Sequence, residues 1–418
     1  MHARPPSLIE TFGRLNRDVR LYLLASGLIG FTIFGGIDTV ILNLYLLRLG
    51  YDPRFIGWVN ATGALTSTLV ALPAGLLGFR AGRRHMMMTG MALLAIGMGA
   101  LPVVEYMPIE LHRSWILVTR GISYLGLGIF QIGGTPFLMG ATKPEERHHA
   151  YALHTAIGPL AGLAGGLVGG LLPSVFANGL NHNLTDTVPY QLSLWVAALV
   201  IVPGFIAVKS TSDVVTEPRK AHKLGDRSYR LIFLLIFVSG FFQLAGERVA
   251  RTYFNVYMNL DFQSTPAFIG TCWAIGHLLS VVTALMTPYL CRRWGIVNVA
   301  VWGAVGMVVS LLLMAWVPHP YIAGLAFVGI IGFAAIRRPP YTIHHQELVT
   351  SDWRPAMAGV TALSAGSSEF TMSLLGGYTI ASLGFTRLFE TGAVMTGFGA
   401  LLFWLYFRHP RGERHSEI

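Results

Sequence analysis

The sequence predicts an all-α integral membrane protein with twelve transmembrane helices, and three observations lead to this fold class. Hydrophobic residues make up 53% of the chain and charged residues only 12%, whereas a soluble domain has about 25% charged residues. The 418 residues include 48 glycines, which let spanning helices pack closely. The apolar residues fall into long runs, and each run is long enough to cross a bilayer.

We expect the spans in two groups of six. A polar stretch rich in Lys and Arg, residues 209–229, separates the groups. The sequence therefore predicts an N-terminal six-helix bundle at 1–208, a cytoplasmic linker at 209–229 and a C-terminal six-helix bundle at 230–418. The expected spans are residues 21–47, 55–78, 86–104, 115–140, 150–176, 190–208, 230–259, 267–290, 296–317, 320–343, 355–383 and 388–407.

The positions of Lys and Arg predict the orientation, because cytoplasmic loops of membrane proteins carry an excess of both. With the N-terminus inside, 21 of the 30 basic residues fall on the inner side, 4 on the outer side and 5 within the apolar runs. Both termini are therefore predicted to be cytoplasmic. The polar, basic stretch 1–20 shows no cleavable signal pattern, and we expect a multi-pass protein of the cell (inner) membrane.

Several other functions are not favoured by the sequence. The net charge of +10 is scattered between apolar runs, so no nucleic acid partner is expected. Cys272 and Cys291 fall on one predicted helix, nearly 30 Å apart at about 1.5 Å per residue, so they cannot pair. The stretch 344–347, His-His-Gln-Glu, lacks the i, i+4 His pair of a zinc helix. We expect no metal, no cofactor and no enzymatic activity. The sequence also has no phosphate-binding loop, which counts against an ATP-driven pump. If the protein is a transporter, its transport would be passive or ion-coupled.

The two groups of spans resemble copies of each other. An Asn-x-Tyr pattern begins at Asn43 and again at Asn255, and Phe-Ile-Gly occurs at 55–57 and at 268–270. Six helices return the chain to the side on which it started, so the copies are parallel. Parallel six-helix repeats imply a site at their interface near the midplane, with rocking around that site.

The loop at 75–84 reads Gly-Leu-Leu-Gly-Phe-Arg-Ala-Gly-Arg-Arg. It resembles the loop 2–3 signature of the major facilitator superfamily (MFS), Gly-x-Leu-x-Asp-Arg-x-Gly-Arg-Arg, except that Phe79 replaces the Asp of the usual charge latch. These residues either anchor the loop at the cytoplasmic surface or point guanidinium groups at neighbouring helix ends or acids, latching an inner gate. The expected gating residues are Gly75, Arg80, Gly82, Arg83 and Arg84.

This resemblance covers the whole chain and implies a transporter whose first, fourth, seventh and tenth helices line a central cavity. Arg120 resembles the family's helix-4 arginine. The pair Gly158-Pro159 partly resembles the Gly-Pro motif of proton-driven exporters. A glycine stripe in the fifth span provides either tight helix packing or a sliding surface between the halves. The expected packing residues are Gly158, Pro159, Gly162, Gly166 and Gly170.

Charged residues within the apolar runs carry the most information about function. A charge at mid-membrane costs about 2.5–3.5 kcal/mol on insertion scales, so such residues usually face a cavity or a charged partner. We expect the substrate- and proton-binding residues among these and their polar neighbours. The candidates are Asp38, Asn43, Arg120, Glu247, Arg248, Arg251, Asn255, Arg337, Arg338, Tyr341 and Glu369.

Two interpretations of these candidates stay open. Glu247 and Arg251, at i and i+4, either form a self-neutralising pair that fixes the helix, or they have a functional role. In the second case Arg248 or Arg251 faces a central cavity as an anion contact, and Glu247 tunes that contact or carries the proton. Asp38 and Glu369 are either proton carriers or fixed partners of arginines. Neighbouring helical residues diverge by about 100°, so we expect the arginines at 337–338 to point in different directions. The prolines at 339–340 are expected to break that helix.

Buried arginines exceed buried acids by five to three, which favours a substrate with an anionic group. We therefore expect proton-coupled efflux of a small organic or amphipathic molecule by alternating access. The alternatives are uptake of an organic anion, flipping of a lipid with an anionic headgroup, and, in another class, a non-transporting receptor or scaffold. Protons and membrane lipids are the expected partners of a monomer.

Overall fold

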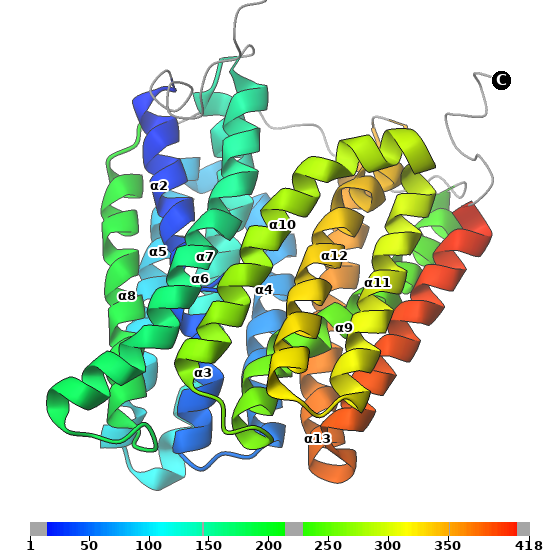
Figure 1. Cartoon of the computed structure of the whole chain (residues 1–418). Coiled ribbons are helices and arrows are strands. Elements are labelled where there is room, and N and C mark those ends of the chain that lie inside the picture. Colours follow the sequence, from blue (N-terminus) through cyan, green and yellow to red (C-terminus); the bar gives the residue numbers. More distant parts are fainter. Residues whose placement is uncertain (1–14, 144–145, 214–228, 351, 408–418) are drawn as a thin grey trace, which may run out of the picture.

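The computed structural model describes residues 15–143, 146–213, 229–350 and 352–407, and for residues 71–81 and 148 it describes the backbone alone. Regular structure within these ranges is entirely helical (Figure 1). The first bundle contains α2 (Arg17–Thr32), α3 (Ile37–Arg48), α4 (Pro53–Ala81), α5 (Arg83–Ala100), α6 (His112–Ala141), α7 (Arg147–Leu180) and α8 (Val188–Lys209). The second contains α9 (Arg230–Leu260), α10 (Pro266–Trp294), α11 (Ile296–Trp316), α12 (Pro320–Glu347) and α13 (Arg354–Phe407).

Ten segments of the described residues are long and apolar enough to cross a membrane. One of these segments joins α2 and α3, and another is the 54-residue α13, which is non-helical at Gly384. A 54-residue helix would extend for about 80 Å, far beyond the roughly 30 Å hydrocarbon core of a bilayer. The chain is therefore a multi-pass membrane protein. The count of twelve spans and the sides of the termini stay predictions.

Equivalent helix starts explain part of the internal repeat. Asp52 caps α4 by accepting a hydrogen bond from the backbone N–H of Phe55 at 3.0 Å, and Thr265 caps α10 in the same way. Proline follows each cap, at a position where a missing N–H costs nothing. Gly82 and Gly295, with φ of 78° and 82°, end these two helices in a backbone conformation that favours glycine.

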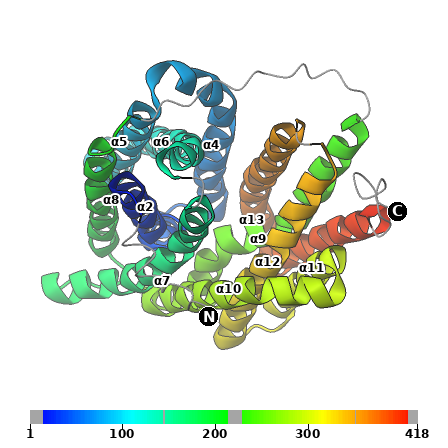
Figure 2. The ribbon, with the colours of Figure 1, turned by 90° about the horizontal axis from the view of Figure 1, so that it is seen from above.

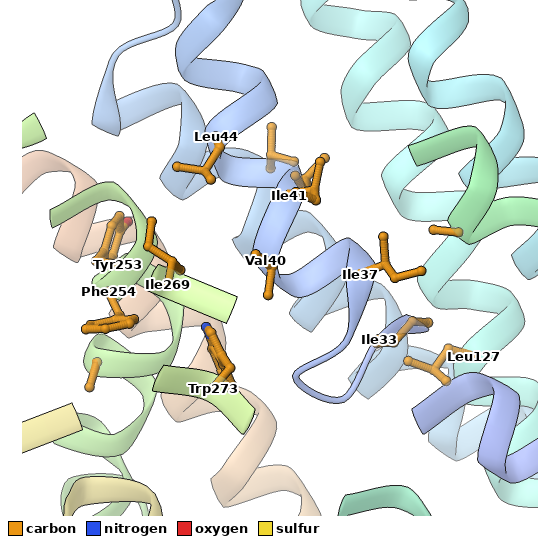
Figure 3. Close-up of a cluster of buried hydrophobic side chains, with 14 of the residues drawn as sticks. Ile33, Ile37, Val40, Ile41, Leu44, Leu127, Tyr253, Phe254, Ile269 and Trp273 are labelled. Carbon is orange, nitrogen blue, oxygen red and sulfur yellow. The ribbon is translucent and has the colours of Figure 1, made fainter. Parts of the chain in front are cut away.

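Seen from above, the helices form two groups, with α2 and α4–α8 in one and α9–α13 in the other (Figure 2). The groups meet where α4 packs against α13, α7 against α10, and α3 against α9. A continuous core crosses this boundary. Figure 3 shows Val40 and Leu44 of α3 facing Tyr253 of α9 and Ile269 of α10. The bounds of the two predicted domains and of their linker stay predictions, because most of 209–229 lies outside the described residues.

The first predicted span is not one helix. The chain leaves the helix after Thr32 and starts α3 at Ile37. Gly35 has a φ of 80°, and the Thr39 hydroxyl donates to the Ile33 carbonyl inside the break. The span expected at 21–47 lies within one candidate membrane span, Arg17–Arg48. The break inside it was not predicted, because hydropathy reports burial and not the continuity of the backbone.

The prediction of a helix break at 339–340 is wrong. The helix α12 continues through Pro339 and Pro340 to Glu347. Two consecutive prolines remove two N–H donors, so the carbonyls of Ala335 and Ile336 lose their helical partners. The fixed φ of proline is compatible with a helix, and packing within protein tolerates the freed carbonyls.

Candidate functional site

Two asparagines connect the bundles. The Asn43 side-chain amide donates to the Thr252 carbonyl at 2.7 Å. The Asn255 amide donates to the carbonyls of Thr39 and Val40, at 2.6 and 3.0 Å. Both asparagines are buried, so their hydrogen bonds are shielded from competing water.

Further polar contacts between the bundles lie near the same end of the molecule. Arg48 donates to the Asn259 side chain at 3.2 Å, and the Trp58 indole donates to the Tyr378 hydroxyl at 3.2 Å. The turns at 49–52 and 261–265 lie at this end, which the distribution of basic residues predicts to be the outer one. The described structure is thus fastened between the bundles at its predicted outer end.

Glu247 is the centre of a cluster of arginines. Its side chain is completely buried, and its Oε1 accepts from Arg251 Nε and from Arg338 Nη2, each at 3.0 Å. A third guanidinium, that of Arg337, lies 3.5 Å from Oε2 and also donates to Gln243. One carboxylate therefore faces three cations, which leaves two positive charges without a counter-charge in the cluster.

The neighbours Arg337 and Arg338 both reach this carboxylate. Their side chains do diverge in environment, since the first is 2% exposed and the second 62%. The two side chains therefore differ in direction as expected, but both are long enough to reach the same carboxylate. Tyr341, one turn further along, lies beneath Arg337 at 5.4 Å from the ring centre and packs against Phe403.

A second pair, Arg248 and Glu369, connects α9 with α13. Arg248 Nη1 lies 3.1 Å from Glu369 Oε2, and 41% of the Glu369 side chain is exposed. Glu369 also acts electrostatically on Arg120 and Tyr124 of the first bundle. This carboxylate therefore faces the boundary between the bundles.

The third pair lies within the first bundle. Arg120 Nη1 donates to Asp38 Oδ2 at 2.9 Å, and both side chains are 5% exposed. The same guanidinium donates to the Tyr124 hydroxyl at 3.1 Å and stacks over its ring at 4.4 Å. Asp38 is thus a fixed partner of an arginine in this conformation.

The three groups of charges differ in their access to solvent. The Asp38–Arg120 pair is buried, whereas Arg251 and Arg338 are 24% and 62% exposed. Charged groups that stay partly exposed at membrane depth usually face a water-filled space or a substrate. Arg251 and Arg338 are therefore the charged residues around Glu247 that solvent reaches most easily.

The predicted gating residues lie at the junction of α4 and α5. Arg84 donates to the Lys209 carbonyl at the end of α8, at 2.5 Å, while Arg83 is buried. For Gly75 and Arg80 the structure describes the backbone alone. Asp213 was not anticipated from the sequence. It lies beside Gly82 and 3.7 Å from His85.

The glycine stripe of α7 lies between the bundles over part of its length. A Cβ at Gly162 would overlap the Phe34 carbonyl, and one at Gly166 would lie 2.8 Å from the carbonyl of Gly35. A Cβ at Gly170 would lie 2.7 Å from the Pro266 carbonyl of α10. At Gly158, just before Pro159, a Cβ would meet nothing within 4 Å.

The sequence interpretation missed two contributors to the interface. Asn60 donates to the Asn43 side-chain carbonyl, and the Trp273 indole donates to that of Asn255, each at 3.0 Å. The Phe-Ile-Gly repeat carries a signal that would have found them. At its offset of 213 residues, Asn60 and Trp273 are equivalent positions.

The model of the family described as Major Facilitator Superfamily matches residues 23–370. The chain belongs to the major facilitator superfamily. Members of this superfamily are transporters and not enzymes. Among the relatives, an uncharacterised MFS-type transporter of Bacillus subtilis, YbcL, is 24% identical over 385 residues, covering 90% of this chain and 92% of the relative. The multidrug resistance protein MdtH of Proteus mirabilis is 24% identical over 260 residues, covering 60% and 58%.

Solved structures agree with the MFS fold. A bacterial homologue of the iron transporter ferroportin, in an inward-facing state, has a TM-score of 0.74 at 13% identity and covers 97% of this chain and 100% of its own. A D-xylose–proton symporter has a TM-score of 0.73 at 13% identity, with coverages of 93% and 97%. At these identities the likeness shows the fold alone.

Proposed function

We propose that this transporter exports a small organic or amphipathic molecule with an anionic group from the cell, through the cell (inner) membrane and in exchange for protons. The observation that carries the proposal is the set of three arginines around Glu247, two of which are partly exposed. Alternating access of two six-helix bundles, twelve spans in all, would expose this site to each side in turn.

The electrostatic argument favours an anion. Two unit charges 4 Å apart interact by about 4 kcal/mol at an effective dielectric constant of 20. An anion beside Arg251 and Arg338 is attracted by two guanidinium groups. It is repelled by one carboxylate, that of the buried Glu247, so the net interaction is favourable. A cationic substrate would meet repulsion of similar size.

Glu369 is the better of the candidate proton carriers. Three guanidinium groups stabilise the ionised form of Glu247, and Asp38 is buried against Arg120. Glu369 has one arginine partner and is 41% exposed, so protons can reach it. Its protonation and deprotonation would break and restore the pair with Arg248, so proton binding at this carboxylate would act on the contact between α9 and α13.

The direction of export is supported by two weaker indications. MdtH, which is named as a multidrug resistance protein, is a relative, and Gly158-Pro159 resembles part of an exporter motif. Uptake of an organic anion would use the same arginines, and a lipid with an anionic headgroup would also fit them. We also propose that both termini lie in the cytoplasm and that the protein is a monomer.

Transport in proteoliposomes tests the function directly. The purified protein is reconstituted with an inward or an outward pH gradient, and the flux of labelled anionic, cationic and neutral compounds is measured in each direction. Flux of anions against their own gradient only when protons flow the opposite way supports proton-coupled exchange. Selective transport of cations would contradict the anion site, and flux independent of the pH gradient would contradict coupling.

A further inference from the structure

The geometry of Arg251 and Arg338 restricts the anion further. Arg251 Nε and Arg338 Nη2 are each 3.0 Å from the same Glu247 oxygen. The two nitrogens can therefore be no more than 6.0 Å apart, whatever the angle between them. Two guanidinium groups from α9 and α12 thus converge on one small region, and a single compact group can contact both.

Most of the donors in this region are unused by protein. A guanidinium has five N–H groups, and within the described residues each of these two arginines makes one protein hydrogen bond, to Glu247. The Arg251 guanidinium also lies 5.7 Å from the Trp273 ring centre, which limits its movement. The remaining donors are available to a ligand with several closely spaced acceptor oxygens.

The charge of the cluster sets the charge of the ligand. Arg251, Arg337 and Arg338 carry three positive charges against the single negative charge of Glu247. The Arg248–Glu369 and Arg120–Asp38 pairs are each neutral and add nothing to this excess. A ligand group with two negative charges would neutralise the cluster, whereas a single negative charge would leave one cation uncompensated.

We propose that the transported anion carries a compact doubly charged group, as a phosphate monoester does, and that this group bridges Arg251 and Arg338. This inference rests on the proposed function and specifies its substrate class. A tetrahedral phosphate group presents three terminal oxygens, which match paired guanidinium donors. A dicarboxylate with well-separated carboxylates would need two distant cationic sites, and the second cationic group here is already paired with Glu369.

Two isosteric probes test the charge separately from the shape. Phenyl phosphate is doubly charged at pH 8, since the second pKa of phosphate monoesters is about 6, whereas phenyl sulfate has the same shape and one charge. Their dissociation constants for the purified full-length protein are measured by calorimetry at pH 8. We expect phenyl phosphate to bind at least about tenfold more tightly, because its second negative charge adds a further Coulombic attraction to the guanidinium groups.

Changing the charge of the site provides the matched test. Arg338→Gln removes one positive charge from a side chain that is 62% exposed, so the fold tolerates it. This variant should bind phenyl phosphate and phenyl sulfate about equally. The control is Arg387→Gln, which removes an equally exposed arginine from its separate pair with Glu390 and should keep the preference of the wild type.

The outcomes distinguish the two proposals. Equal binding of both probes to the wild type overturns the doubly charged substrate and leaves the anion site standing. An unchanged preference in Arg338→Gln removes the bridging role of this residue and overturns the inference. If neither probe binds while a cationic compound does, both the inference and the proposed function fail.

Discussion

Asn43 and Asn255 make the same contact in opposite directions across the two bundles. Asn43 of α3 donates to a carbonyl of α9, and Asn255 of α9 donates to two carbonyls of α3. Each asparagine also accepts a hydrogen bond from the equivalent helix of its own bundle, from Asn60 or from Trp273. The internal repeat therefore produces an approximate twofold fastening at the predicted outer end.

Removing either asparagine should loosen this fastening. A buried hydrogen bond contributes about 1 kcal/mol net, so Asn43→Ala, which removes one bond between the bundles, should raise the population open at this end about fivefold. Asn255→Ala removes two such bonds and should raise it further. Spin labels on the turns at 49–52 and 261–265 would report the change as longer distances in double electron–electron resonance. Asn298→Ala is the control, since the hydrogen bond of Asn298 within the described residues goes to the Trp294 carbonyl at the end of α10, inside the second bundle. Unchanged distances between the spin labels in both variants would show that these hydrogen bonds do not hold the two bundles together.

Arg251→Gln should weaken binding of anionic ligands. Hydrogen bonds to charged groups contribute about 1.5–3 kcal/mol, so the dissociation constant of a bound anion should rise about 10- to 100-fold. Thermal-shift titration of the purified variant measures this change. Arg387→Gln, remote from the cluster, should bind anions as the wild type does. An unaltered affinity in Arg251→Gln would place the anion elsewhere.

Glu369→Gln should uncouple transport from protons. The variant lacks the titratable group but keeps the arginine cluster, so substrate exchange without a gradient should continue. Accumulation driven by a pH gradient should fall to the level without a gradient in proteoliposomes. Asp38→Asn serves as the comparison, and it should reduce stability more than coupling because it leaves Arg120 buried without its partner. Full gradient-driven accumulation by Glu369→Gln would remove this residue from the coupling step.

Glu247→Gln should destabilise the fold strongly. Removing one partner of a buried ion pair costs about 3–5 kcal/mol because the remaining charge is uncompensated, and here three guanidinium groups lose their shared carboxylate. The melting temperature should therefore drop by several degrees. Adding Arg337→Gln should recover part of the loss, since Arg337 is the most buried of the three. Glu390→Gln, in an exposed pair worth about 0–1 kcal/mol, is the control. Equal melting temperatures in all variants would contradict the role of Glu247 as the counter-charge.

Gly170→Ala should interfere with the contact between α7 and α10. The added Cβ would lie 2.7 Å from the Pro266 carbonyl, which is backbone and cannot rotate away. We expect a lower melting temperature and slower transport. Gly158→Ala adds a methyl group that meets nothing within 4 Å, and because alanine favours helix over glycine, it should be neutral or stabilising. A lower melting temperature for Gly158→Ala than for Gly170→Ala would contradict the packing of the glycine stripe between the bundles.

The sequence was enough to single out the charged residues within the apolar runs, but not most of their partners. A charge in an apolar run cannot face lipid cheaply, so local pattern alone singled out Asp38, Glu247 and Arg338. Pairing depends on tertiary packing. Arg338 contacts a glutamate 91 positions earlier in the chain, and Arg120 contacts an aspartate 82 positions earlier. No local sequence pattern predicts contacts between residues so far apart in the chain.

Local rules also failed where packing overrides backbone preference. The prolines at 339–340 should end a helix in isolation, but α12 is held by α10 and α11 on either side of them. At the interruption near Gly35, by contrast, local backbone preference and packing agree. Glycine permits the positive φ, and the ring of His277 fills the space where a side chain at this position would lie.

That interruption makes the two bundles mechanically unequal. In the second bundle α9 is an unbroken rod of 31 residues, so its two ends must tilt together. In the first, the 12-residue α3, about 18 Å long, meets α2 at an angle set by Gly35 and packs against α7, α8 and α9. Because Gly35 separates α3 from α2, a change of angle at this one residue would alter the contact between α3 and α9 without bending a continuous helix.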